Sequence, residues 1–147
     1  MSYLLFKSAL TRFEFIVDGP PVSQQARTRG KGNRLEDWKK TVLQEAKKYW
    51  SSEQKIATGW VLLQITYFYD SDLMDVDNRV KPIQDAIKGL AYVDDNQVSD
   101  LIVRKRNLSG NFRIENMTST TLTEGFARGN EFLHIVVIDA PNQEVII

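Results

Sequence analysis

Apolar residues along the chain gather in short runs that predict strands. Residues 13–17 and 60–69 are rich in aromatic and β-branched side chains, and residues 101–108 and 132–139 are interpreted as two further strands. The run at 60–69 holds so few polar residues that we expect it inside the sheet rather than at its edge. The pattern therefore predicts four strands.

Two other segments carry apolar residues at helical spacing. In residues 35–50 the positions on one face are Leu35, Trp38, Val42, Ala46 and Tyr49. In the second segment they are Val80, Ile83, Ile87 and Leu90, and the element ends near Gly89. Pro82 lacks a backbone N–H and fits only a first turn, so this helix is expected to begin within a few residues of Asn78, with Asp77 or Asn78 as its cap.

The connecting segments complete the predicted architecture. Residues 22–34 are polar and contain two glycines, which predicts an exposed basic loop, and the Thr/Ser/Gly-rich residues 116–130 are interpreted as a loop or hairpin. The order strand, helix, strand, helix, strand, strand predicts an α+β fold with two main helices packed on one mixed sheet. We expect a single domain over residues 1–147, in which residues 116–147 form a C-terminal extension that no motif places.

The composition is that of an ordinary globular protein, with 42% hydrophobic and 26% charged residues in a chain of 147. No stretch approaches the roughly 20 apolar residues that cross a bilayer, and the first residues lack the pattern of a secretion signal. We therefore expect a cytoplasmic protein with no membrane role. The sequence has no cysteine and a single histidine, His134, which excludes thiolate and multi-histidine metal sites within one chain. Any metal must bind oxygen ligands.

The net charge of zero hides two blocks of opposite sign. Residues 27–48 hold eight basic residues against three acidic ones, whereas residues 70–100 hold eight acidic residues against three basic ones. A local basic patch attracts nucleic acid even in a neutral chain. We expect the first four of these basic side chains to contact DNA phosphates, namely Arg27, Arg29, Lys31 and Arg34.

The acidic block carries the candidate chemistry. Asp75 and Asp77 are two residues apart, so on an extended segment their carboxylates point the same way. At about 5 Å they would repel by roughly 3 kcal/mol at an effective dielectric near 20, and a divalent cation between them would remove this cost. All-oxygen ligation suits Mg²⁺ or Mn²⁺. Asp94 and Asp95 follow the helix and could supply a third carboxylate, while Lys81, one turn after Asp77, could stabilise a phosphorane or a leaving oxygen.

Plainer interpretations of these residues are also open. Acidic residues clustered in a loop often form a solvated surface, and so do basic ones. A calcium loop fits poorly, because no Asp here begins a D-x-[DN]-x-[DN]-G run with a terminal Glu. His134 lies in an apolar run and is interpreted most simply as a packed or surface side chain.

The run D-V-D-N-R-V-K-P-I-Q-D-A-I-K-G, followed by V-D-D-N-Q-V, resembles the RusA family of Holliday junction resolvases. It is similar to the family pattern D-x-D-N-x-x-K-x-x-x-D-A-L with a later D-D-x-Q-V, and it departs only at Ile87, which stands at the usual leucine position. The N-terminal pattern F-x-V-x-G-P-P-x-S, which starts at Phe15, is also similar to the opening of the family. The likeness covers residues 13–106.

The resemblance implies a Mg²⁺-dependent homodimeric endonuclease that nicks four-way DNA junctions symmetrically in recombination and repair. It implies that Asp75, Asp77 and Asp95 are catalytic metal ligands, that Lys81 is the catalytic lysine, and that Asp94 assists the metal site. A bacterial, phage or prophage origin agrees with this family. Two alternatives stay open: a branched-DNA binding protein that does not cleave, and a nuclease of the same fold that acts on flaps, forks or RNA.

Overall fold

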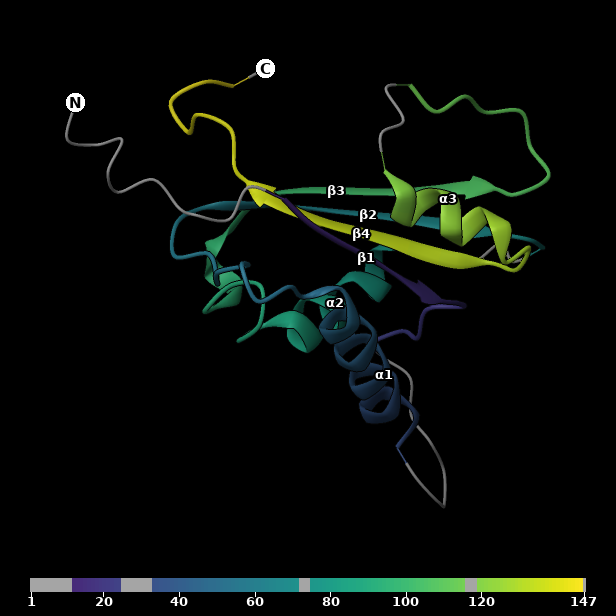
Figure 1. Cartoon of the computed structure of the whole chain (residues 1–147), viewed down its shortest axis with the longest axis horizontal. Helices are drawn as coiled ribbons and strands as arrows, with labels where there is room; N and C mark the ends of the chain where they lie inside the picture. The colour runs from purple at the N-terminus through teal and green to yellow at the C-terminus, as the bar shows by residue number, and fades with distance from the viewer. Residues whose placement is uncertain (1–11, 25–32, 72–74, 116–118, 147) are drawn as a thin grey trace.

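A computed structural model describes residues 12–24, 33–71, 75–115 and 119–146. Four strands form one sheet in the order β1-β4-β2-β3 (Figure 1). Their bounds are β1 Arg12–Asp18, β2 Val61–Tyr69, β3 Val98–Asn107 and β4 Phe132–Asp139. Strands β2 and β3 run parallel, whereas β4 is antiparallel to both β1 and β2, so the sheet is mixed, as predicted.

Helices cover both faces of this sheet (Figure 1). Helices α1 (Arg34–Tyr49) and α2 (Val80–Ile87) lie on one face, and α3 (Thr120–Ala127) lies on the other. Two short 3₁₀ turns, η2 (Asp77–Arg79) and η3 (Asp95–Gln97), flank α2 along the chain. The predicted α+β fold is confirmed. None of the helices in the described part of the chain is long and apolar enough to cross a membrane.

The main core lies between the sheet and helices α1 and α2. Alternate strand residues point into it, because successive side chains of a strand face opposite sides of a sheet. Each fully buried aliphatic or aromatic side chain contributes about 1.5–3 kcal/mol. The buried residues that α1 and α2 supply are Trp38, Val42, Ala46, Val80, Pro82, Ile83, Ala86 and Ile87.

Strand β4 makes part of the C-terminal extension integral to the fold. It lies between β1 and β2 and forms hydrogen-bonded ladders with both. Residues 132–137 are all buried, which explains why this run is apolar at every position except His134. Residues 132–139 therefore occupy the centre of the sheet.

Helix α3 corrects the prediction of a loop or hairpin over residues 116–130. Ser119 caps the helix by accepting a hydrogen bond from the backbone N–H of Leu122 at 3.0 Å. Leu122 and Phe126, one turn apart, pack with Phe132 in a second, smaller core. The helix is weak by propensity, because it contains several threonines and Gly125. Its packing on Phe132, which local sequence does not reveal, stabilises it.

The entry to α2 also differs from the expectation. The chain turns at Val76 (φ −92°, ψ −18°), makes the η2 turn, and enters α2 after Arg79. Neither turn nor helix has a side-chain cap, so the predicted capping role of Asp77 or Asn78 is wrong. The backbone around Asp75 and Asp77 was also predicted to be extended, and this is wrong because the chain turns at Val76.

Candidate active site

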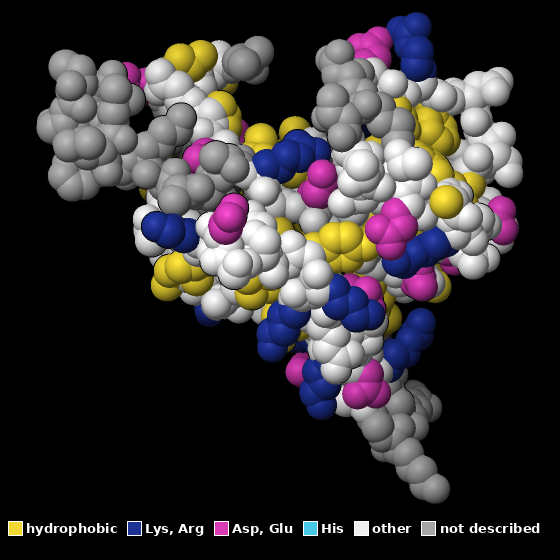
Figure 2. All heavy atoms as spheres, viewed as in Figure 1, with side chains coloured by type: hydrophobic (Ala, Val, Ile, Leu, Met, Phe, Trp, Pro, Cys, Tyr) yellow, Lys and Arg dark blue, Asp and Glu magenta, His cyan; other side chains and the backbone are white. Residues whose placement is uncertain are grey.

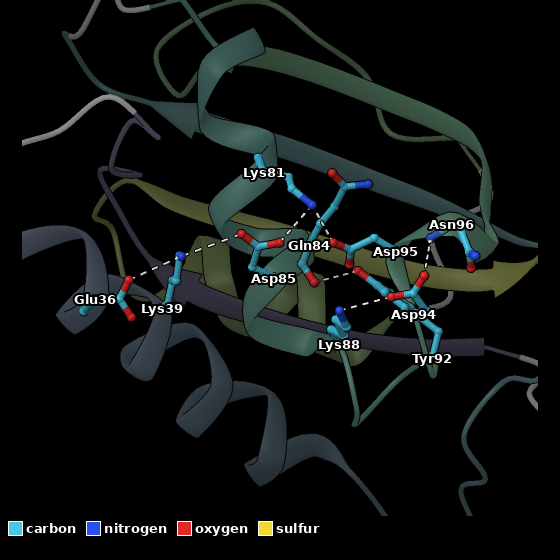
Figure 3. Close-up of polar contacts among 10 residues, drawn as sticks. All are labelled: Glu36, Lys39, Lys81, Gln84, Asp85, Lys88, Tyr92, Asp94, Asp95 and Asn96. Carbon is cyan, nitrogen blue, oxygen red and sulfur yellow. Dashed lines mark hydrogen bonds and ion pairs between the residues drawn. The ribbon is translucent and has the colours of Figure 1, made fainter.

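Four charged side chains form an alternating row beside α2 (Figure 3). The Lys81 ammonium pairs with Asp85, one helical turn further on, at 2.9 Å, and with Asp95 of η3. On the other side of the row, Lys39 of α1 lies 3.6 Å from a carboxylate oxygen of Asp85. The structure thus brings together two of the predicted site residues, Lys81 and Asp95.

The η3 turn that carries Asp95 is fastened by Gln97. The side-chain oxygen of Gln97 accepts hydrogen bonds from the backbone N–H groups of Val93 and Asp94 at 2.8 and 2.9 Å. Its side-chain nitrogen donates to the carbonyl oxygens of Ala57 and Gly59, both at 2.9 Å. These four bonds give Gln97, two residues after Asp95, a structural role, because they fix the position of the turn that carries Asp95.

Tyr92 fixes the distance between this turn and α2. Its ring is fully buried, and its hydroxyl donates to the Gln84 carbonyl oxygen at 2.8 Å. Burial raises the pKa of Tyr92, so it remains a neutral donor. Just before it, Gly89 adopts φ +87°, where residues other than glycine are strained, and donates its N–H to the Tyr92 carbonyl oxygen at 2.7 Å.

The opposite charges of the row shift the pKa values of Lys81 and Asp85 in favour of their ionised forms. Hydrogen bonds to Asp95 and Asp85 raise the pKa of Lys81, which keeps its ammonium charged. Partial burial acts to raise the pKa of Asp85, but the contacts with Lys81 and Lys39 outweigh it and hold that pKa below its usual value. Lys81 and Asp85 are therefore both ionised near neutral pH.

Asp95 keeps one carboxylate oxygen available for a ligand. Its Oδ1 is buried and has no hydrogen-bond partner among the described residues, while Oδ2 binds Lys81. A buried carboxylate oxygen without a partner is costly, and a bound cation would satisfy it. The donor chemistry at Asp95 therefore fits a hard divalent cation.

Asp94 faces a different partner. Its carboxylate pairs with Lys88 at 3.0 Å and accepts a hydrogen bond from the Asn96 backbone N–H at 3.3 Å (Figure 3). The contacts with Lys88 and with this N–H lower the pKa of Asp94. Because Asp94 caps its own turn whereas Asp95 contacts Lys81, the geometry favours Asp95 as the ligand.

The other two predicted ligands, Asp75 and Asp77, are both exposed and lie on the turn before α2. Within residues 12–24, 33–71, 75–115 and 119–146, no three acidic or histidine side chains are grouped closely enough to hold a metal ion. The structure therefore does not gather Asp75, Asp77 and Asp95. Their role as joint metal ligands stays a prediction.

The basic loop is anchored next to these acidic residues. The Gln24 backbone N–H donates to the Asn78 carbonyl oxygen at 2.8 Å, which ties the start of the loop to the η2 turn. Arg27, Arg29 and Lys31 lie outside the described residues, and Arg34 is the exposed first residue of α1. Figure 2 shows Lys and Arg side chains interspersed with acidic ones over α1.

Two features of this site were not predicted as such. Asp85 stands one helical turn after Lys81, a spacing visible in the sequence, but its role as a link between two lysines was missed. Lys39 comes to it from α1, and its position depends on how α1 packs against α2. Sequence periodicity alone carries no such information.

Comparison with known proteins places the chain in a family. Residues 18–115 match the family model described as Endodeoxyribonuclease RusA, which is more than half of the chain. The matched range contains α1, β2, α2, η3 and β3, and with them every charged residue of the row. A search of curated proteins finds no match. On the family match, the chain belongs to the RusA endodeoxyribonuclease family.

Proposed function

We propose that the chain is a Mg²⁺-dependent, structure-selective DNA endonuclease that resolves four-way junctions by paired symmetric nicks. The observation that carries this proposal is the contact between Lys81 and Asp95, inside the range that matches the endonuclease family. The second oxygen of Asp95 is buried and has no partner in the described part of the chain. Resolution of such junctions would place the protein in recombination and repair.

The metal would be held by Asp75, Asp77 and Asp95, with Asp94 as an assisting residue. Carboxylate oxygens suit Mg²⁺, and Mn²⁺ could replace it. When bound, the cation lowers the pKa of a water molecule and offsets negative charge on the scissile phosphate. The buried oxygen of Asp95 is the strongest support for this ligand set.

Lys81 acts in this proposal as a fixed positive charge. Its side chain is half exposed at 50%, so its ammonium can reach a phosphate while Asp85 and Asp95 hold it in place. The raised pKa of Lys81 makes it a poor base at neutral pH, which leaves electrostatic stabilisation of the phosphate or of the leaving oxygen as its role. Lys39 is a positioning residue that acts through Asp85.

DNA would be held by Arg27, Arg29, Lys31 and Arg34. The tie between Gln24 and Asn78 supports this, because it starts the basic loop beside the acidic turn. Affinity should then fall with rising salt in proportion to the number of phosphates contacted. A homodimer would match the twofold symmetry of a four-way junction by presenting two identical sites.

The test compares a labelled four-way junction, a flap and a linear duplex, each incubated with the protein in Mg²⁺ and in Mn²⁺. We expect paired symmetric nicks in the junction and little cutting of the duplex. The variant Asp75→Asn should bind the junction without cutting it, whereas Glu53→Gln, an exposed carboxylate between α1 and β2, should cut normally.

Each alternative has its own outcome in this assay. Binding without cutting by the unaltered protein would indicate a junction-binding protein. Preferential cutting of flaps, or of forks or RNA added as further substrates, would keep the nuclease and replace the substrate. Normal cutting by Asp75→Asn would contradict the assigned site.

A further inference from the structure

The face of the sheet opposite α1 and α2 carries a cleft of about 610 Å³. Its floor is the sheet, and its walls are residues 112–115 and the start of α3. Figure 2 shows the molecule hollowed above the sheet beside α3. This volume lies in the range of pockets that bind small molecules and nucleotides, which is roughly 300–1,000 Å³.

The floor of the cleft is polar although it is deeply buried. Thr66 of β2 is opposite both Arg104 of β3 and His134 of β4 in the strand register, so these three side chains form one row. Thr66 and His134 are each only 5% exposed. The Thr66 hydroxyl lines the cleft and has no hydrogen-bond partner in the described part of the chain. Because Thr66 lines the cleft, its hydroxyl can bond there to a ligand or to solvent.

The nearby acid, Glu14, has three close neighbours of its own, all at the same carboxylate oxygen. His134 donates through Nε2 to a Glu14 oxygen at 2.7 Å, since an ionised carboxylate can only accept. The Ser119 hydroxyl donates to the same oxygen at 2.9 Å, and Arg12 lies 3.4 Å from it. Glu14 therefore does not neutralise the other arginines of the cleft.

Arg104 and Arg106 line the cleft with no acidic partner among the described residues. They are two positions apart on β3, so both point to this face, and both are exposed. Arg106 donates only to the neighbouring carbonyl oxygen of Lys105 at 2.9 Å. By contrast, Arg113 at the wall pairs with Glu115 at 2.7 Å. Two guanidinium groups without a counter-charge beside a cavity attract an anion, and their planar forks suit phosphate.

An aromatic ring stands beside these arginines. Phe112 is 36% exposed, and its inner side packs on Phe68 and Phe126 with ring centroids 5.7 and 6.0 Å away. A ring supported from behind and open to the cleft is suited to stack with a nucleobase. The cleft therefore combines phosphate-binding and base-binding groups.

We propose that this cleft binds a nucleoside phosphate. Arg104 and Arg106 hold the phosphate, the Thr66 hydroxyl donates to it or to the sugar, and Phe112 stacks on the base. Two sources share this chemistry: a free mononucleotide and one nucleotide of a DNA strand. The site lies on the other face of the sheet from Lys81 and Asp95, so it does not depend on the proposed nuclease activity.

The test uses His134 as a reporter, because it is the only histidine of the chain and it lines the cleft. Its imidazole NMR signals are followed at constant pH, without divalent metal, during titration with thymidine monophosphate, a short thymidine oligonucleotide or inorganic phosphate. DNA bound beside α2 lies on the opposite face of the sheet and should leave these signals in place. We expect the mononucleotide or the oligonucleotide to shift them.

Variants identify the groups that bind. In Arg104→Ala/Arg106→Ala the ligand concentration for half of the shift should rise at least about tenfold, because two charge-assisted contacts are lost. Phe112→Ala should weaken nucleotide binding and leave the response to inorganic phosphate unchanged. The matched control is Lys47→Ala/Lys55→Ala, which removes two exposed charges away from the cleft and should bind as the unaltered protein does.

The outcomes separate the sources and can overturn the proposal. Shifts with both nucleotide ligands indicate a site for free nucleotides, and shifts with the oligonucleotide alone indicate a DNA-strand site. His134 signals that do not move with either ligand would overturn the proposal, as would equal shifts in Arg104→Ala/Arg106→Ala. An equal response to inorganic phosphate at the same concentration would reduce the cleft to a general anion site and overturn the nucleotide assignment.

Discussion

The two faces of the sheet use charge in opposite ways. On the face covered by α1 and α2, Lys39, Asp85, Lys81 and Asp95 alternate in sign and compensate one another. One oxygen of Asp95 is left without a partner among the residues that the structure describes. On the face covered by α3, the acid Glu14 contacts His134, Ser119 and Arg12. Arg104 and Arg106 have no acidic partner in the described part of the chain. The first arrangement suits a cation held on oxygen. The second suits a phosphate.

The faces also differ in how they are built. Every charged residue of the first row lies within the family match at residues 18–115, and so do Thr66, Arg104, Arg106 and Phe112 of the second cleft. Helix α3 and strand β4, which complete the wall and floor of that cleft, lie beyond the match. The range of the match therefore does not separate the two sites. Because they lie on opposite faces of the sheet, changes to the second should leave cutting by the proposed first site intact if the protein folds.

The largest effect is expected from the first face. Replacing Lys81 with Met removes the positive charge while keeping most of the apolar stem. Junction cutting in Mg²⁺ should fall by about 10²–10³-fold, as for other groups that stabilise a developing charge. Single-turnover rates measure this, with Lys55→Met as the matched control. A rate within about threefold of the unaltered protein would show that Lys81 has no part in the chemistry.

The next effect concerns stability on the second face. A Cβ at Gly125 would lie 2.3 Å from the Phe132 ring, which is buried against the sheet and has little room to move. Gly125→Ala should therefore lower the free energy of unfolding by about 3 kcal/mol. Urea unfolding measures it.

Gly59→Ala provides the matched comparison, because a Cβ there meets nothing within 4 Å. It should change stability by less than about 1 kcal/mol. Equal stability of the two variants would mean that α3 does not pack on Phe132 as described.

A smaller effect links the fold of the first face to its activity. Gln97→Ala removes four hydrogen bonds around η3 and should lower the free energy of unfolding by about 2 kcal/mol. Because Asp95 loses its fixed position, cutting should fall as well, at temperatures where the variant is still folded. Circular dichroism and the cutting rate together test this. Full activity in Gln97→Ala would show that cutting does not depend on the hydrogen bonds that hold the η3 turn.

The smallest effect is the pH dependence of stability, and it comes from the second face. Burial lowers the pKa of His134 below its usual value, so the unfolded chain binds a proton more readily than the folded one. Stability should therefore fall as pH drops from about 6.5 toward 5. The pKa of Glu14 is also lowered, since its hydrogen bonds to His134 and Ser119 outweigh its burial, and this adds a loss below about pH 4.5.

Urea unfolding at several pH values measures this dependence. The variant His134→Gln keeps a donor for Glu14 but does not titrate, so the loss between pH 6.5 and 5 should disappear while the loss below pH 4.5 remains. An unchanged loss above pH 5 in His134→Gln would assign it to another group.

The same comparison shows what sequence could predict. Strands and α1 follow from local periodicity, and the spacing of Lys81 and Asp85 on α2 is visible in the sequence. Helix α3 was missed because its stability comes from Phe132, which follows it in the chain and meets it only in the fold. Likewise, Arg104 and Arg106 alternate in the sequence, but only the register with Thr66 and Phe68 shows which face they share.

The structure brings together only some of the predicted site residues, and the path of the backbone explains which. Lys81 and Asp95 come together because the chain returns after α2 through a turn that Gln97 and Tyr92 fix in place. The extended geometry expected for Asp75 and Asp77 failed because the backbone turns at Val76 before α2. Single-residue backbone turns of this kind have no strong sequence signal.

The most direct test of the central claim is cutting of a labelled four-way junction by Asp95→Asn in Mg²⁺, with binding measured in the same samples. The substitution keeps the size of the side chain and removes the charge that would hold the cation. We predict unimpaired binding and a loss of cutting of about 10³-fold or more, larger than the loss in Asp94→Asn, which still caps its turn. Cutting by Asp95→Asn at the rate of the unaltered protein would contradict the account.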